Sequence, residues 1–159
     1  MEPFRPTSAF NFRIELDVPG VTKQVCSAEF AECDGLEISM QPRTIRAGGL
    51  NGQQIHLMGP VSYGQLTLRR GMTNNADLWQ WFDLMQQKGR QGIRANGSVV
   101  MLAPDGKGTQ ATFVLTRCLP VKLKGPALNA KDGQVAIEEL QLVYETLRFQ
   151  PPQANPPGR

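Results

Sequence analysis

The sequence predicts a mainly β protein, an antiparallel β-barrel or two packed sheets, with one flanking α-helix. Glycine (16) and proline (12) are plentiful among the 159 residues, which favours many turns between short strands over a helical bundle. Several segments alternate apolar and polar residues as half-buried strands do, and one segment spaces its apolar residues as an amphipathic helix does. The length fits one domain, residues 1–149, followed by a Pro-rich tail, residues 150–159.

Three strands are predicted before the first long connection. Residues 10–18 alternate without a break, with large apolar side chains on one face and polar side chains on the other. After a Pro-Gly turn, residues 25–33 are the predicted return strand, and residues 36–41 alternate again as a third strand. The polar face of the first strand consists of Asn11, Arg13, Glu15 and Asp17.

Residues 47–60 (AGGLNGQQIHLMGP) are rich in glycine and make an unusually long connection. Long connections inside compact domains are usually functional or mobile. We expect either a projecting arm whose apolar residues contact a partner, or a loop that folds back onto the same core. The apolar residues concerned are Leu50, Ile55, Leu57 and Met58.

A predicted strand over residues 62–70 leads into a helix predicted over residues 75–88. Asn74 or Asn75 is suited to cap the helix, and Asp77 in the first turn interacts favourably with the helix dipole. Apolar residues at the i, i+3, i+4 and i+7 positions predict the face that covers the barrel. These residues are Leu78, Trp81, Phe82 and Met85.

Trp79 lies about 100° around the helix from Leu78, on the flank of that apolar face. We expect Trp79 to be partly buried against its own domain. A subunit boundary is the alternative, because aromatic residues are enriched at interfaces. Arg69 and Arg70 close the preceding strand, and this dyad is expected to be an exposed strand end.

The C-terminal half adds three further predicted strands. Residues 97–103 and 111–119 flank the turn sequence PDGKG and predict a hairpin, with Pro120 ending the second strand. Residues 135–149 fit a helix as well as a strand. We favour a strand, in which a bulge near Glu138 and Glu139 shifts the phase of the apolar residues.

The titratable residues indicate no enzymatic or metal chemistry. His56 is the single histidine, and Cys26, Cys33 and Cys118 are scattered, whereas a structural zinc site needs four ligands, often in close pairs. An odd number of cysteines also argues against a complete disulfide framework and for synthesis in a reducing compartment. We therefore expect no catalytic residues, no cofactor, no metal and no enzymatic activity.

Other classes of protein are also disfavoured by the sequence. The net charge of +3 comes without a cluster of basic and aromatic residues, so nucleic-acid binding is not indicated. No stretch reaches the apolar length of a membrane span, and the first residues lack the apolar region of a signal peptide.

Five segments of the chain form an ordered series: FNFRI (10–14), FAECDGL (30–36), YGQLTLRRG (63–71), LWQW (78–81) and a closing block (120–145). Their order and spacing resemble those of the contractile-tail tube protein family, over nearly the whole chain. Three features depart from the family pattern. Asp34 stands where Ser is usual, Met58-Gly59-Pro60 stands where Leu/Met-Pro-Gly is common, and the Pro-rich tail is additional.

The resemblance implies a tail-tube-like barrel that forms hexameric rings, stacked into a hollow inner tube that conducts cargo inside a contractile sheath. Implied partners are further copies of the chain, the sheath protein, baseplate, spike or initiator proteins, and a cargo effector or DNA in the lumen. The implied location is cytoplasmic assembly into a phage tail or a phage-tail-like particle, some of which are released from the cell. The long connection is then expected to reach a neighbouring ring.

In such a tube, the polar face of residues 10–18 would point to the lumen or to a neighbouring subunit. The net charge of +3 predicts a lumen that is not strongly acidic. Two other functions stay open at this point. One is a tube initiator at the baseplate end of the same machine, and the other, from a different class, is a small-ligand-binding or enzymatic β-barrel.

Overall fold

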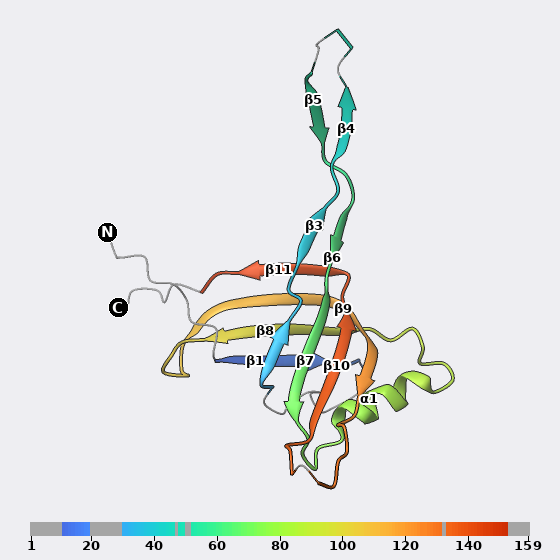
Figure 1. Cartoon of the computed structure of the whole chain (residues 1–159), viewed down its shortest axis with the longest axis vertical. Coiled ribbons are helices and arrows are strands. Elements are labelled where there is room, and N and C mark those ends of the chain that lie inside the picture. The colour runs from blue at the N-terminus through green and yellow to red at the C-terminus, as the bar shows by residue number, and fades with distance from the viewer. Residues whose placement is uncertain (1–10, 20–29, 47, 50–51, 132, 153–159) are drawn as a thin grey trace.

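The computed structural model describes residues 11–19, 30–46, 48–49, 52–131 and 133–152. Figure 1 shows a body of crossed strands, a long arm that projects from it, and a helix at the end of the body away from the arm. The elements are β1 (Phe12–Asp17), β2 (Glu32–Asp34), β3 (Ile38–Met40), β4 (Arg43–Arg46), β5 (Gln54–Leu57), β6 (Val61–Tyr63), β7 (Gln65–Gly71), α1 (Asp77–Gln86), β8 (Ala95–Leu102), β9 (Thr109–Lys124), β10 (Ile137–Val143) and β11 (Thr146–Gln150).

Two antiparallel sheets make up the body, and they share β9. The first, here called the β1 sheet, runs in the order β1-β8-β9-β11, and the second, the β7 sheet, runs β2-β7-β10-β9. The strands of the two sheets run across one another in Figure 1. Among the described residues, no strand pairing closes the sheets into a barrel. The prediction of a mainly β fold with packed antiparallel sheets and one helix is confirmed.

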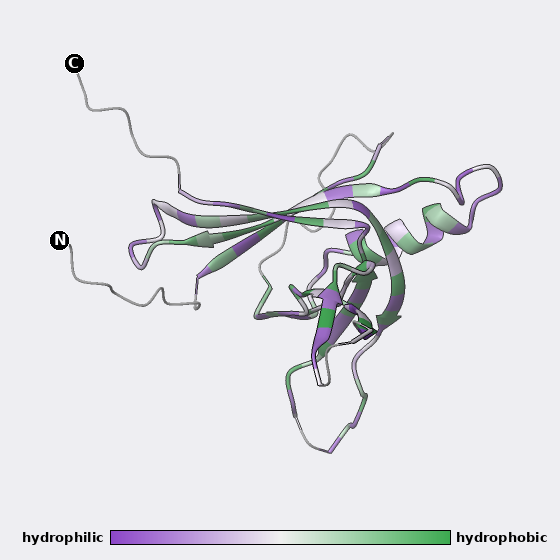
Figure 2. Cartoon of the chain, turned by 90° about the horizontal axis from the view of Figure 1, so that it is seen from above, coloured by the Kyte–Doolittle hydropathy of each residue, from purple (hydrophilic) through white to green (hydrophobic). Residues whose placement is uncertain are grey.

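The core lies between the two sheets because each strand presents alternate residues to it. Along β1, for example, Ile14 and Leu16 are buried while Arg13 and Asp17 are exposed. Figure 2 shows this alternation of hydrophobic and hydrophilic residues along the strands of the body. The buried apolar cluster consists of Ile14, Leu16, Val18, Phe30, Leu66, Leu68, Leu78, Trp81, Ala95, Val99, Leu115, Cys118, Leu140, Leu142, Tyr144 and Leu147.

The long strand β9 corrects one prediction. The sequence predicts that the strand ends before Pro120, but β9 continues to Lys124. Its first part pairs with β8 and β11, and its last part pairs with β10. Pro120 lies where the register to β10 shifts, so its missing N–H falls at an irregularity of the ladder. Nearby Arg117 has a φ of 52°, and the two residues mark the bend by which β9 leaves one sheet for the other.

The C-terminal segment is strand, as predicted, but its phase is not the predicted one. Residues 137–150 form two strands, β10 and β11, which belong to different sheets. Glu138 occupies an inward position together with Leu140 and Leu142, whereas Ile137 is 52% exposed. The predicted bulge near Glu138 and Glu139 is therefore wrong, and the irregularity lies between Gln141 and Leu142. The prediction assumed that only apolar residues point inward.

Helix α1 is shorter than the predicted range at both ends, and its N-cap is Ala76, so the prediction of Asn74 or Asn75 as the cap is wrong. The Asn75 side chain accepts a hydrogen bond from the Asp77 N–H at 3.2 Å, and the Asp77 side chain accepts one from the Leu78 N–H at 2.8 Å. These contacts satisfy N–H groups that have no partner inside the helix. The structure places Leu78 and Trp81 in the core and packs Phe82 and Met85 against it as partly buried residues.

The third predicted strand and the long connection belong to one structure, a two-stranded arm. β3 pairs with β6 near the body, and β4 pairs with β5 farther out. The prediction of a loop over residues 47–60 is therefore wrong, because residues 54–57 form a strand. The arm is also longer than predicted, since it begins at Ile38 and ends at Tyr63. No helix of the described part of the chain is long and apolar enough to span a membrane.

Candidate functional site

The arm carries one apolar face and one polar face. In its outer ladder, Ile45 pairs with Ile55 and Arg43 with Leu57, so these four side chains share a face. The alternate positions are polar, and Thr44 Oγ1 lies 3.3 Å from Nδ1 of His56. The inner ladder repeats the pattern, with one face apolar and Ser39 hydrogen-bonded to Ser62 on the other. The apolar residues of the inner ladder are Ile38, Met40 and Val61.

These apolar side chains remain in solvent. Ile55, Leu57 and Met58 are exposed, and Met58 is 76% exposed. Leu50 lies outside the described residues. The predicted contact residues do not include Ile38, Met40, Ile45 and Val61, although the alternation in residues 43–46 and 54–57 indicates an amphipathic hairpin. Exposed apolar side chains gathered on a projecting element are typical of a protein–protein contact.

The arm is attached firmly to the body through Tyr144. The buried Tyr144 hydroxyl donates to the Gly35 carbonyl at 2.7 Å and accepts from the Glu37 N–H at 3.2 Å. Gly35 has a φ of 104°, and a Cβ there would lie 1.9 Å from the Gln65 carbonyl oxygen. The base of the arm therefore requires glycine at this position and is held by a core side chain.

Midway along the arm, the two ladders are joined at a close backbone approach. The Gln41 N–H donates to the Pro60 carbonyl at 3.2 Å. A Cβ on Gly59 would lie 1.7 Å from the Gln41 carbonyl oxygen. Two residues separate β3 from β4, whereas three separate β5 from β6, so one strand carries an extra residue here. An extra residue of this kind bends and twists a two-stranded ribbon.

We expect Gly59→Ala to disrupt the arm and leave the body intact, because the added methyl group collides with the backbone of the facing strand. Hydrogen exchange of the arm amides should become faster, while the thermal unfolding midpoint of the domain stays close to that of the wild type. Gly48→Ala is the matched control, since nothing lies within 4 Å of a Cβ at that position. Equal protection of the arm in both variants would contradict this account of Gly59.

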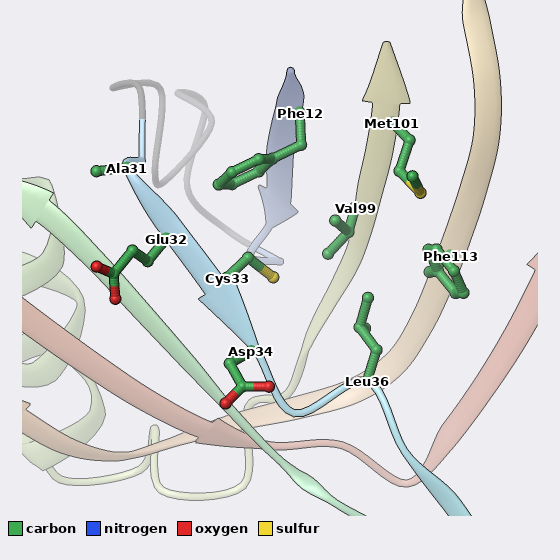
Figure 3. A pocket seen from close by; sticks show the side chains of 9 residues that line it. All are labelled: Phe12, Ala31, Glu32, Cys33, Asp34, Leu36, Val99, Met101 and Phe113. Carbon is green, nitrogen blue, oxygen red and sulfur yellow. The ribbon is translucent and has the colours of Figure 1, made fainter. Parts of the chain in front are cut away.

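A second feature is an apolar groove between β2 and the β1 sheet. Its volume is about 410 Å³. Figure 3 shows Cys33 turned toward Phe12 and Val99. Burial and the charge of Asp34 raise the pKa of the Cys33 thiol to about 12, so the thiol is protonated at neutral pH. The lining residues are Phe12, Ala31, Glu32, Cys33, Asp34, Leu36, Val99, Met101 and Phe113.

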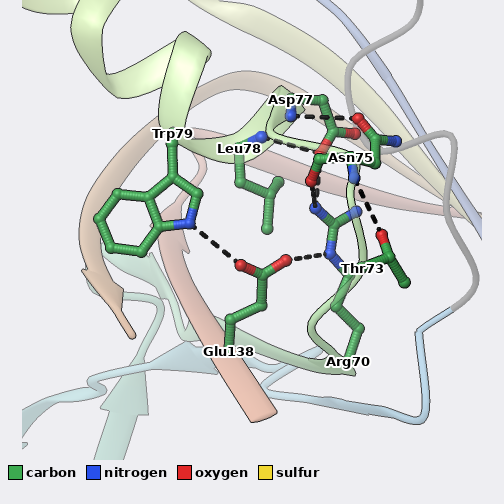
Figure 4. Close-up of polar contacts among 7 residues, drawn as sticks. All are labelled: Arg70, Thr73, Asn75, Asp77, Leu78, Trp79 and Glu138. Carbon is green, nitrogen blue, oxygen red and sulfur yellow. Dashed lines mark hydrogen bonds and ion pairs between the residues drawn. The ribbon is translucent and has the colours of Figure 1, made fainter. Parts of the chain in front are cut away.

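A buried ion cluster holds α1 against the β7 sheet. Arg70 and Glu138 are each 1% exposed, and Arg70 Nε donates to Glu138 Oε1 at 2.5 Å. Arg70 Nη2 also donates to Asp77 Oδ1 at 2.5 Å, and the guanidinium lies 5.4 Å from the Phe30 ring centroid. Figure 4 shows Arg70 and Trp79 approaching Glu138 from two sides. Burial opposes the charge of Arg70, but the hydrogen bonds to Asp77 and Glu138 outweigh it and raise its pKa.

This cluster corrects the prediction for the arginine dyad. Arg69 is exposed, as expected, and forms ion pairs with Glu32 at 3.0 Å and Glu139 at 2.9 Å. Arg70 is buried because it shares the inward phase of β7 with Leu66 and Leu68. Adjacent residues of a strand face opposite sides, so the dyad divides between the surface and the core.

Trp79 rests on its own domain. Its indole N–H donates to Glu138 Oε2 at 3.1 Å, and its ring lies against Gly125, while 38% of the residue stays exposed. The hydrogen bond from Trp79 completes the set of donors around a buried carboxylate. The exposed part of the ring leaves the predicted interface role of Trp79 as a hypothesis.

The polar faces of the two sheets carry charges of both signs. On β1, Arg13 and Asp17 are exposed and Glu15 is half-buried, and Arg13 Nε lies 2.7 Å from Glu15 Oε1. Asn11, which precedes β1, is also half-buried. Among the described residues, no group of three or more His, Cys, Asp or Glu side chains is placed to hold a metal ion.

Comparisons with known proteins identify relatives of this fold. A chain in the structure of the anti-feeding prophage (AFP) baseplate is 26% identical, with a TM-score of 0.81, over 94% of this chain and 98% of that one. A chain of the PVC sheath-tube complex, an extracellular contractile injection system, is 20% identical, with a TM-score of 0.73, over 92% of each chain. Hcp1 from Salmonella typhimurium is 11% identical, with a TM-score of 0.52, over 88% of this chain and 86% of that one.

No curated protein matches the sequence. The family model described as T4-like virus tail tube protein gp19 matches residues 8–148, which include the body, the arm and the helix. The chain belongs to the T4-like virus tail tube protein family.

Proposed function

We propose that this chain is the structural subunit of the inner tube of a contractile injection system or phage tail, and that it assembles into hexameric rings that stack into a hollow conduit. The observation that carries the proposal is the arm, whose apolar residues Ile45, Ile55, Leu57 and Met58 are all exposed in the single chain. Burial of large apolar side chains is the main favourable term in association. Membership of the tail tube family and the likeness to a chain of a six-fold symmetrised baseplate support the same conclusion.

The proposed partners are other proteins of the same contractile machine. The PVC relative belongs to a sheath-tube complex and the AFP relative to a baseplate, which supports contacts of this chain with a sheath protein and with baseplate, spike or initiator proteins. We propose that an effector protein or DNA passes through the lumen. The paired charges on the sheet faces, such as Arg69 with Glu32 and Glu139, support a wall without a dominant negative charge.

We propose a non-catalytic role and assembly in the cytoplasm into a phage-tail-like particle. His56, the single histidine, lies exposed on the arm next to Thr44. Cys33 has a raised pKa, and Glu138 is occupied by Arg70 and Trp79. These contacts support structural roles for the residue types that most often act as acids, bases or nucleophiles.

A tube initiator at the baseplate end is a second candidate, and the likeness to a chain of the AFP baseplate favours it. Electron microscopy of the purified protein separates the two functions. A repeated subunit should polymerise into tubes of many rings as its concentration rises. An initiator should stop at single rings or short stacks and elongate only when a separate tube protein is added.

We expect Leu57→Asp to abolish ring stacking while leaving the monomer folded, because a carboxylate would then occupy the centre of the apolar face of the arm. His56→Asp, which places the same side chain on the opposite face of the same strand, is the matched control and should still assemble. Pelleting assays and electron microscopy measure assembly, and circular dichroism measures the fold. Normal tubes from Leu57→Asp would show that this face is not an interface.

A further inference from the structure

We infer that the apolar face of the arm of one copy docks into the groove beside β2 of a second copy. The inference rests on the proposed function and names the surface that receives the arm. The arm and the groove are different surfaces of one chain, so the contact is heterologous. Heterologous contacts generate rings or open-ended stacks rather than closed dimers.

The chemistry of the arm is apolar and cationic. Arg43 lies on the same face as Leu57, Ile45 and Ile55, whereas Arg46 pairs with Gln54 on the opposite face. No acidic residue occurs in the sequence from residue 38 to residue 63. A surface that receives this face should therefore be apolar, with negative charge at its edge.

The groove has that chemistry. Phe12, Met101 and Phe113 contribute its apolar wall, and the acidic residues Glu32 and Asp34 belong to its lining, which contains no Lys or Arg. Glu32 is paired with Arg69 at 3.0 Å. Asp34 is exposed and makes no ion pair with another described residue. Asp34 is therefore the carboxylate that is available to an incoming arginine.

A competing surface on the same chain fits the arm less well. Leu128, Val135 and Ile137 are also exposed apolar residues, in or next to the connection between β9 and β10. That connection carries Lys131 and Asp132 and follows Lys124 at the end of β9, so residues 124–136 hold two positive charges and one negative charge. The net charge of this segment is therefore +1, whereas the groove lining carries two carboxylates and no Lys or Arg, so charge complementarity with the arginines of the arm favours the groove.

A charge-reversal cycle tests the inference on the full chain. Arg43→Glu and Asp34→Arg should each raise the critical concentration for tube assembly about tenfold or more, and the double variant should return it close to the wild-type value. Arg46→Glu, the same change on the opposite face of the arm, should leave the critical concentration nearly unchanged. A double variant that assembles no better than the worse single variant overturns the inference, as does an equal effect of Arg43→Glu and Arg46→Glu.

Photo-crosslinking gives a direct second readout. A benzophenone amino acid at position 57, in a mixture of isotopically heavy and light copies, should crosslink to peptides of another copy that contain Cys33 or Met101. Crosslinks to residues 125–136, or only within one copy, would overturn the inference while leaving the proposed tube function in place. A wild-type protein that forms neither rings nor tubes would remove the proposed function itself, and the inference with it.

Discussion

Glu138→Ala should lower the free energy of unfolding by about 3–5 kcal/mol, because it removes the fully buried one of the two counter-ions of the Arg70 guanidinium. Arg70 would keep its hydrogen bonds to Asp77 and to the Asn75 carbonyl and its contact with the Phe30 ring. The Trp79 N–H would also lose its acceptor. Urea unfolding followed by circular dichroism measures the change, and a loss below about 1 kcal/mol would contradict the assigned role of this cluster.

The neighbouring residue supplies the control. Glu139→Ala removes a carboxylate one position away, and this carboxylate pairs with Arg69 at the surface. The loss of stability should be far smaller than for Glu138→Ala, because exposed ion pairs contribute little. The double variant Arg70→Met with Glu138→Leu should recover much of the stability lost in Glu138→Ala, since apolar residues of similar size can replace a buried ion pair. Failure of this recovery would indicate that the ion pair is needed for the position of α1.

Trp81→Ala should cost about 3–5 kcal/mol and leave little soluble protein, because it empties a large volume between α1 and the sheets. Trp81 is 2% exposed and belongs to the apolar core. Trp79→Ala should cost less, about 1–3 kcal/mol, mainly through the lost hydrogen bond to Glu138. Unfolding curves of the two variants test the order of these effects. A larger loss for Trp79→Ala would show that the wrong face of the helix has been assigned to the core.

The same pair of variants tests the interface hypothesis for Trp79. A Trp79→Ala protein that is folded but forms no rings would place the exposed part of the indole at a subunit boundary. A folded protein with normal rings would restrict Trp79 to its role beside Glu138.

Much of the body could be predicted from the sequence, because its strands and helix obey local periodicity. Residues 10–18 alternate cleanly, and β1 lies within that range. The spacing of Leu78 and Trp81 likewise predicts the buried side of α1. The residues that resemble the tail tube family spread over these same elements, and the family match covers them.

Other features of the structure could not be predicted, because they depend on contacts between segments that are far apart in the sequence. Arg70 and Glu138 are 68 positions apart in the sequence. A charged residue is not expected in the core without a counter-ion, and only the structure shows that these two residues are neighbours. Pro120 normally ends a strand, and only the change of sheet partner explains why β9 continues through it. The groove is formed by β2 together with β1, β8 and β9, so no local pattern could indicate it.

Electron microscopy of the purified wild-type protein at high concentration, together with sedimentation velocity, tests the central claim most directly. The tube function predicts six-fold rings that stack into tubes, with the arm of each subunit in contact with another copy. A single sharp monomer boundary in the centrifuge, with no rings or tubes on the grids, would contradict it.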